Sequence, residues 1–268
     1  MVNRGKKSIL GIEIDVCDYK ECVNQVIHCA KKGVPLSVSA LAVHGVMTGV
    51  KDLEHQSRLN RFSIIAPDGQ PVRWALRFLY GERLADRVYG PNLTLEVCKA
   101  AEDQNIPVYF YGSTEKVLKK LSKNLKEKFP NLIIAGTQPS KFRKLSEEEH
   151  VELGKELNES GAKIFFIGLG CPRQEVFVYE QMDQISFPML AVGAAFDFHA
   201  GLLRQAPNWM QKNGLEWLFR FIIEPRRLWK RYIFLNPEYI YRLVLQKFFG
   251  TPKVKTLKPT QIKPEYFG

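Results

Sequence analysis

Six short, continuous apolar segments are the strongest constraint on the fold. They occupy residues 36–41, 62–67, 106–112, 131–137, 162–170 and 187–196. Amphipathic stretches of helical length separate several of them, such as residues 113–129 and 145–160. Strands without polar alternation are typical of sheets buried on both faces, and strands that alternate with helices form parallel sheets. The sequence therefore predicts an α/β fold, with a Rossmann-like parallel-sheet domain over residues 1–202.

The two clearest helices carry signals at their ends. Ser113 and Ser146 precede them as candidate N-caps, and Glu149, three residues after Ser146, completes a capping box. Gly161 follows the second helix, where a left-handed residue commonly ends a helix.

Positive charge is concentrated after the α/β region. Residues 203–258 contain twelve lysines and arginines and three glutamates, a net charge of +9, whereas the first 202 residues carry only +2. We expect a helical appendage over residues 203–249, with breaks near Gly214, Pro225 and Pro237. Residues 250–268 contain three prolines and no periodicity, which predicts a flexible tail.

The appendage mixes rings and cations in a way that suits neither a core helix nor a solvated one. A polyanionic surface, nucleic acid or anionic lipid, would attract its charge. Aromatic and basic side chains together favour a membrane interface. The candidate membrane-contact residues are Trp217, Arg226, Trp229, Lys230, Arg231 and Tyr232.

Targeting signals and cysteines bear on the compartment. The basic first dozen residues are not followed by an apolar run of secretory type, and Asp197 and His199 interrupt the best spanning candidate. The five scattered cysteines are expected to be reduced thiols. We therefore expect a cytoplasmic protein that associates peripherally with the membrane.

Four predicted strand ends carry residues that can do chemistry, and ligands of open parallel sheets bind at such ends. Asp68 in "PDG" is either a turn aspartate or a general base. Gly112 and Ser113 either relieve steric crowding or hold a phosphate beside a helix N-terminus. The third strand end has a turn with Gly168, Arg173 and Gln174, and the fourth has a turn with Asp197 and His199. A metal site formed by Asp197 and His199 is the less favoured interpretation of the fourth.

The order of five motifs resembles the WecG/TagA/CpsF family of glycosyltransferases over roughly residues 8–235. The motifs are "PDG", "RVYGPNL", "GLGCPRQE", "GAAFDFHAG" and "RQAPNWMQKNGLEWLFRFIIEPRR". The resemblance implies a Rossmann-like enzyme that transfers a sugar with inversion and without a metal or other cofactor. The donor would be a UDP-sugar and the acceptor a polyprenyl-diphosphate-linked sugar at the inner face of the cell membrane. The product would enter teichoic acid, common antigen, capsule or exopolysaccharide synthesis.

The resemblance also implies roles for particular residues. Asp68 matches the proposed catalytic base, Arg87 an active-site arginine, and Gln174 a polar residue of the sugar pocket. Arg220, Arg227 and Lys230 match basic positions of an appendage thought to close over the active site at the membrane. One departure concerns a T-x-N stretch of many relatives, which is replaced here by Ala40 and Ala42, with Ser39 or His44 as possible substitutes.

Two other function classes remain open at this point. A nucleotide-sugar epimerase or NAD-dependent oxidoreductase would need a G-x-G-x-x-G loop after the first strand, and the chain has none. A nucleic-acid-binding protein would fit the basic appendage, but no helix-turn-helix, RNP or zinc signature is present. We expect no nucleic-acid partner, and a homo-oligomer is a further possibility.

Overall fold

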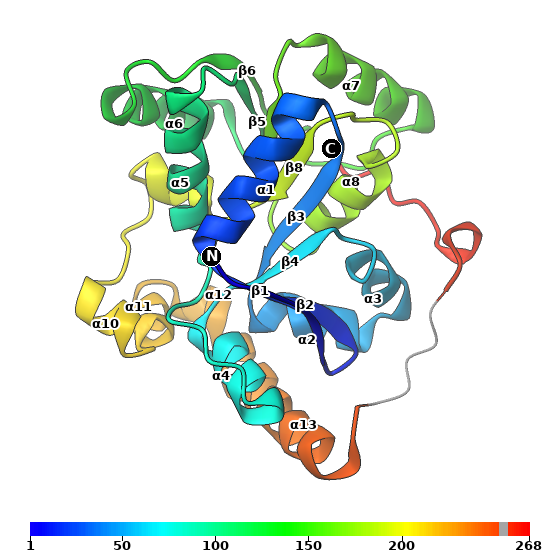
Figure 1. Ribbon diagram of the computed structural model, residues 1–268, viewed down its shortest axis with the longest axis vertical. Coiled ribbons are helices and arrows are strands. Elements are labelled where there is room, and N and C mark those ends of the chain that lie inside the picture. The colour runs from blue at the N-terminus through cyan, green and yellow to red at the C-terminus, as the bar shows by residue number, and fades with distance from the viewer. Residues whose placement is uncertain (252–256) are drawn as a thin grey trace.

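The computed structural model of the chain describes residues 1–251 and 257–268, apart from the side chains of Asn208, Lys212, Arg227, Lys230 and Arg231. Its centre is a parallel sheet with the strand order β4-β3-β8-β7-β5-β6 (Figure 1). The strands are β3 (Leu36–Leu41), β4 (Ile64–Pro67), β5 (Val108–Gly112), β6 (Ile134–Gln138), β7 (Ile164–Gly168) and β8 (Pro188–Ala191). All six apolar segments contain one of these strands, so the predicted Rossmann-like α/β class is confirmed.

Helices cover both faces of this sheet, which explains why its strands are largely apolar. On one face lie α1 (Tyr19–Lys32), α5 (Gly90–Asp103), α6 (Glu115–Lys128) and α9 (Ala195–His199). On the other lie α2 (Val43–Lys51), α3 (Leu53–Leu59), α4 (Gln70–Tyr80), α7 (Glu147–Glu159) and α8 (Arg173–Gln181). Successive residues of a strand point to opposite faces. In β7, accordingly, Phe166 joins the first core and Phe165 the second.

The connections after β3 and β8 run to opposite faces of the sheet. α2 follows β3 on one face, and α9 follows β8 on the other, although the two strands are neighbours. Such a reversal leaves a crevice at the carboxyl ends of the strands, which is where ligands of open α/β sheets bind. Asp68 follows β4, on the other side of β3, so it borders this crevice.

The helix-end predictions are confirmed in two cases of three. Ser146 caps α7 in a reciprocal capping box with Glu149, and Gly161 has a left-handed φ of 76°. Thr114 rather than Ser113 caps α6, accepting a hydrogen bond from the Val117 N–H. Ser113 itself has a φ of 56°, which is incompatible with the extended backbone of an N-cap residue.

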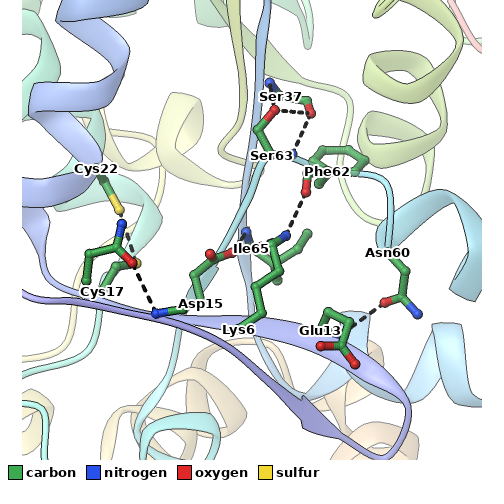
Figure 2. Close-up of polar contacts among 12 residues, drawn as sticks. Lys6, Glu13, Asp15, Cys17, Cys22, Ser37, Asn60, Phe62, Ser63 and Ile65 are labelled. Atoms are coloured by element: carbon green, nitrogen blue, oxygen red, sulfur yellow. Dashed lines mark hydrogen bonds and ion pairs between the residues drawn. The ribbon is translucent and has the colours of Figure 1, made fainter.

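An antiparallel hairpin, which the sequence analysis did not predict, precedes the sheet and covers its edge. β1 (Asn3–Ile9) and β2 (Ile12–Cys17) are joined by Leu10 and Gly11, both with positive φ. The Asp15 carboxylate accepts the Ile65 N–H of β4 at 2.7 Å, and Lys6 donates to the Phe62 carbonyl at 2.7 Å (Figure 2). An edge strand needs such partners for its outward-facing groups. Leucine at a turn position that favours asparagine or glycine hid the hairpin in the sequence.

The appendage is helical, as predicted. It comprises α10 (Asn208–Lys212), α11 (Glu216–Ile223), α12 (Pro225–Lys230), the π-helical segment η1 (Arg231–Leu235) and α13 (Asn236–Phe249). Breaks occur at Gly214, whose φ is 72°, and just before Pro225. The predicted break at Pro237 is wrong, because the π-helical turn before it accommodates the proline and the helical path continues into α13.

Side chains of α13 attach the appendage to the body. Gln246 donates to the Ser8 carbonyl at 2.7 Å and accepts the Leu10 N–H at 2.8 Å, which ties the helix to the β1–β2 turn. Tyr239 is buried and its hydroxyl donates to the Pro71 carbonyl at 3.4 Å, at the start of α4. α13 therefore packs along α4, and the two helices project together from the sheet (Figure 1).

Residues 257–268 differ from the expected flexible tail, since they lie against the body. They include the short 3₁₀ helix η2 (Pro259–Gln261). The Glu180 carboxylate accepts the N–H groups of Glu265 and Tyr266, and the buried Arg58 donates to the Lys263 carbonyl at 2.6 Å. The buried Arg58 on α3 and the half-buried Glu180 on α8 supply partners that the proline pattern did not reveal.

None of the helices among the described residues has both the length and the apolar composition required to cross a bilayer.

Candidate active site

Asp68 is held at the carboxyl end of β4 by backbone contacts. Its N–H donates to the Leu41 carbonyl of β3 at 3.2 Å. Its carboxylate accepts the Gly90 N–H, at the start of α5, at 3.4 Å. Gly69 follows with a φ of 83° and begins α4, a conformation that only glycine adopts readily. The Asp-Gly pair therefore forms a turn, in agreement with the interpretation of Asp68 as a turn aspartate. The same turn places the Asp68 carboxylate at the crevice.

A cavity of about 190 Å³ surrounds Asp68 and has walls from both the body and the appendage. The body contributes Ala42, Val43, His44, Asp68, Gly69, Gln70, Pro71, Arg87 and Tyr89. The appendage contributes Gly214, Glu216, Trp217, Arg220, Leu228, Tyr232, Leu235 and Asn236. Ligand sites commonly measure about 300–1,000 Å³. The cavity is therefore sized for a sugar-like part of a ligand, with the remainder outside it.

A buried ion pair joins the two halves of this wall. The Arg87 guanidinium donates to the Glu216 carboxylate of α11, and both residues are less than a tenth exposed. Arg87 also lies over the Tyr89 ring, with its Cζ 4.2 Å from the ring centroid. Arg220 lines the same cavity and lies over the Phe198 ring at 5.7 Å. Breaking a buried ion pair leaves an uncompensated charge. The Arg87–Glu216 contact therefore favours the arrangement in which α11 lies against the body.

The carboxyl group of Asp68 has an unusual pKa. Burial raises the pKa from 3.8 to about 6; Arg87 opposes the shift, Glu216 adds to it, and the Gly90 N–H and Arg220 oppose it. With this pKa, Asp68 is ionised in most molecules at neutral pH. It is also a better proton acceptor than an aspartate of ordinary pKa. The surroundings of Asp68 are therefore those of a general base.

The loop that carries Arg87 is fixed by its neighbours. The Tyr89 N–H donates to the Tyr19 hydroxyl at 2.8 Å, and the Arg87 N–H donates to the Asp86 carboxylate at 2.8 Å. Burial raises the pKa of Tyr19 to about 12, so its hydroxyl stays protonated. Arg87 is thereby positioned before any ligand arrives.

Gln174 lies on the other side of the crevice, within a buried polar cluster. Its amide donates to Glu175 at 2.8 Å, and Ser39 of β3 donates to the same carboxylate at 3.1 Å. The Gln174 Oε1 is buried and has no hydrogen-bond partner among the described residues. The amide lies beside Gly193, next to Val192, whose carbonyl approaches Gly90. Gln174 thus lies beside the loop that follows β8, outside the cavity around Asp68, with a buried acceptor that has no partner among the described residues.

The remaining predicted ligand residues do not line the cavity around Asp68. Strands are roughly 4.8 Å apart, which puts the end of β7 about 14 Å and the end of β5 about 19 Å from that of β4. A Cβ on Gly112 would lie 2.8 Å from the Gly168 backbone, and one on Gly168 would lie 2.5 Å from the Phe196 ring. Close packing therefore accounts for both glycines. Ser113 adjoins Gly112, and Arg173 is exposed at the start of α8.

Asp197 and His199 do not form a metal pair. They are two positions apart on α9, so their side chains do not share a face of the helix. His199 Nε2 bonds to the Pro91 carbonyl at 2.8 Å, which fixes the start of α5 instead. Among the described residues, no three His, Cys, Asp or Glu side chains are grouped as metal ligands would be.

Ala40 and Ala42, the two positions where the resemblance led us to expect polar residues, lie at the crevice. Ala42 lines the cavity, and Ala40 contacts the position of Gly90. Of the two possible substitutes, His44 lines the cavity, whereas Ser39 is fully buried against Glu175. His44 is therefore the better placed.

The predicted membrane-contact residues separate into groups. Trp217 and Tyr232 line the cavity and contact each other, with ring centroids 5.6 Å apart. Trp229 is 41% exposed, and Arg226 is exposed as well. The side chains of Arg227, Lys230 and Arg231 lie outside the described residues. Tyr232 thus faces the cavity, because the π-helical turn directs it toward Trp217.

Glu216 is the main site residue that sequence reasoning missed. One signal could have found it, since it is one of only three acidic residues in the strongly basic region 203–258. An isolated acid amid arginines and aromatic residues indicates a specific partner, and that partner is Arg87.

Two comparisons with known proteins bear on the family of the chain. The N-acetylglucosaminyldiphosphoundecaprenol N-acetyl-beta-D-mannosaminyltransferase of Bacillus subtilis (strain 168) is 26% identical over 215 residues, which cover 79% of this chain and 80% of that protein. The model of the Glycosyl transferase WecG/TagA/CpsF family matches residues 7–253, nearly the whole chain. The chain therefore belongs to the WecG/TagA/CpsF family of glycosyltransferases.

Proposed function

We propose that this protein transfers a hexose-type sugar from a UDP-sugar to a polyprenyl-diphosphate-linked acceptor, with inversion at the anomeric carbon. The reaction would take place at the inner face of the cell membrane, in the synthesis of a cell-surface polysaccharide. Family membership and the diphosphoundecaprenol acceptor named for the Bacillus relative support this substrate class. The observation that carries the proposal is a carboxylate of raised pKa in a cavity shared by the body and the basic appendage.

The chemistry requires one base and a counter-charge. Asp68 removes the proton of the acceptor hydroxyl as its oxygen attacks the anomeric carbon. The bond from that carbon to the diphosphate breaks on the opposite face, and UDP leaves with the bonding electrons. Arg87 and Arg220 are the cations of the cavity and stabilise the negative charge that develops on the diphosphate. The free Oε1 of Gln174 accepts a hydrogen bond from the donor.

The acceptor brings the enzyme to the membrane. The exposed Arg226 and Trp229 meet the headgroup layer, where each cation contributes about 1 kcal/mol near an anionic leaflet. Docking of the appendage there holds Glu216 against Arg87 and keeps Arg220 in the cavity.

The test is a donor screen with a short-chain polyprenyl-diphosphate sugar, in which release of UDP and the mass of the product are measured. The wild-type chain is expected to turn over at least one UDP-sugar, and Asp68→Asn to lose at least 100-fold in kcat while remaining folded by circular dichroism. Asp183→Asn is the control, since this exposed carboxylate follows α8 and does not line the cavity. Wild-type turnover by a folded Asp68→Asn would remove Asp68 from the role of base.

A further inference from the structure

A second cavity, larger and almost wholly apolar, adjoins the one around Asp68. It measures about 680 Å³ and lies between α4 and α13, with Trp74 and Phe78 on one side and Ile240, Leu243 and Val244 on the other. We call it the α4–α13 groove. Its volume falls within the range of about 300–1,000 Å³ that ligand sites occupy. Soluble proteins seldom leave an apolar hollow of this size without a use.

The groove and the Asp68 cavity form one continuous space. Val43, Pro71, Gly214, Trp217, Tyr232 and Asn236 line both. The character of the walls changes along it. The Asp68 end has Arg87, Arg220 and Glu216, whereas the groove has no charged lining residue among those described. The matching ligand is charged at one end and hydrocarbon at the other.

Apolar side chains of α13 within the groove and beyond it are exposed to solvent. Ile240 is 61% exposed and Phe248 is 77% exposed. A hydrocarbon chain that follows the groove outward therefore stays in apolar surroundings until it leaves the protein. An exposed strip of this kind is costly in water and is suited to a lipid phase.

We propose that the α4–α13 groove binds the first isoprene units of the polyprenyl chain of the acceptor. The acceptor diphosphate then lies at the junction of the two cavities, which Gly214, Tyr232 and Asn236 line, and the acceptor sugar extends toward Asp68. This inference rests on the proposed function for the identity of the charged end. The hydrocarbon character of the other end follows from the walls of the groove alone.

Direct binding tests the groove without any turnover. Trp74 and Trp217 line it and are two of the four tryptophans of the chain. Titration with geranylgeranyl diphosphate below its micelle concentration is expected to change tryptophan fluorescence in a saturable way. Inorganic diphosphate at equal concentration is expected to produce no such change. Absence of a saturable change with geranylgeranyl diphosphate, or an equal response to a lysophospholipid, would overturn the proposal.

Val244→Trp fills the groove, and Leu245→Trp is the matched control. The two positions are neighbours on α13, with exposures of 40% and 37%, but only Val244 lines the groove. The measured quantity is the ratio of kcat/KM for a long-chain acceptor to that for the same diphosphate sugar on a short alkyl chain. We expect Val244→Trp to reduce this ratio at least tenfold and Leu245→Trp to leave it within twofold of wild type.

Each outcome separates the groove from the proposed function. Turnover of the short-chain acceptor by the wild-type chain establishes the transferase activity, whatever the groove binds. An unchanged ratio in Val244→Trp overturns the groove as the polyprenyl site and leaves the activity standing. Loss of vesicle binding in step with the ratio assigns the groove to membrane lipid instead. Conversion of an oligomer to a monomer assigns it to a second copy of the chain, and either result overturns the proposal.

Discussion

At the scale of single residues, the proposed chemistry depends on how three charged groups set the pKa of Asp68. Burial and the charge of Glu216 raise the pKa of Asp68 to about 6, and the charges of Arg87 and Arg220 oppose this increase. Glu216 therefore has two effects. It joins the appendage to Arg87, and it makes Asp68 a stronger base than the two arginines alone would allow.

Removal of the Glu216 charge is expected to shift the pH dependence of the reaction. In the wild-type chain, kcat/KM should rise with pH through about 6 as Asp68 ionises. Glu216→Gln removes a negative charge that raises the pKa of Asp68, so the acid limb should move to lower pH. The measurement is kcat/KM from pH 4.5 to 8 for both proteins. A limb at the same pH in both would mean that the charge of Glu216 does not act on the base.

A buried carboxyl with a raised pKa also lowers stability at neutral pH. Between about 4 and 6 the folded state binds more protons at Asp68 than the unfolded state does, so the free energy of unfolding falls as pH rises through this window. Asp68→Asn cannot ionise and escapes this loss. We expect it to unfold at a higher temperature than wild type at pH 7.5, and at a similar temperature near pH 4.

The size of this effect is on the order of 2–3 kcal/mol at most, since one pKa unit corresponds to about 1.4 kcal/mol. Asp197→Asn is a suitable comparison, because this partly buried carboxylate lies outside the Asp68 cavity. Equal thermal shifts in the two variants at pH 7.5 would attribute the gain to general charge reduction.

At the scale of elements, the β1–β2 hairpin supports the strand that carries the base. Asp15 accepts the Ile65 N–H at 2.7 Å and lies 3.4 Å from the Lys6 ammonium (Figure 2). Asp15→Ala removes a partner from a backbone donor and is expected to lower the free energy of unfolding by about 1–3 kcal/mol. Glu13→Ala, on the same strand, should change it by less than about 0.5 kcal/mol. Denaturant unfolding of the two variants makes the comparison, and equal losses would mean that the edge contact adds no stability.

The sequence predicted those elements whose signals are local. The strands were evident because they are short apolar runs, most clearly β4, β5, β7 and β8, which are buried along most of their length. The helix α7 was evident because Ser146 and Glu149 form a local capping box. The ordered residues 257–268, the Glu216 contact and the anchoring of the hairpin turn by Gln246 depend on partners far along the chain. Arg87 and Glu216 are 129 positions apart, and Leu10 and Gln246 are 236 apart. No local pattern determines such pairs.

The same distinction applies to the site. Three different elements bring these side chains together. Asp68 follows β4, Arg87 lies in the loop that Tyr19 fixes, and Arg220 lies on α11 of the appendage. Motif order indicated all three residues. Gly112 and Gly168 were chosen from equally suggestive turns, yet the strand order separates them from β4. Turn composition identifies a strand end, and only the order of strands in the sheet shows which ends are neighbours.

At the scale of the whole molecule, charge is divided between a nearly neutral body and a basic appendage that closes the reaction cavity. Residues 203–258 carry +9 of the total of +11. A surface charged in this way is attracted to an anionic leaflet, and the attraction weakens with salt because the Debye length falls from about 10 Å at 0.1 M to about 3 Å at 1 M. Binding to anionic vesicles should therefore decrease steeply between these salt concentrations, and binding to neutral vesicles should be weak throughout.

A pair of charge reversals locates the membrane-facing side. Arg226→Glu alters the exposed surface of α12, and Lys123→Glu makes the same change in net charge on α6, where Lys123 is 74% exposed. Each reversal changes the charge by two, and at about 1 kcal/mol per charge near the surface, Arg226→Glu should weaken vesicle binding by roughly 2 kcal/mol, or about 30-fold. Lys123→Glu should weaken it only slightly, because α6 lies on the body, away from α12 (Figure 1). Co-sedimentation with vesicles that contain anionic lipid measures both. Equal weakening would mean that the protein responds only to net charge, and a stronger effect at Lys123 would place the membrane-facing side on the body rather than on the appendage.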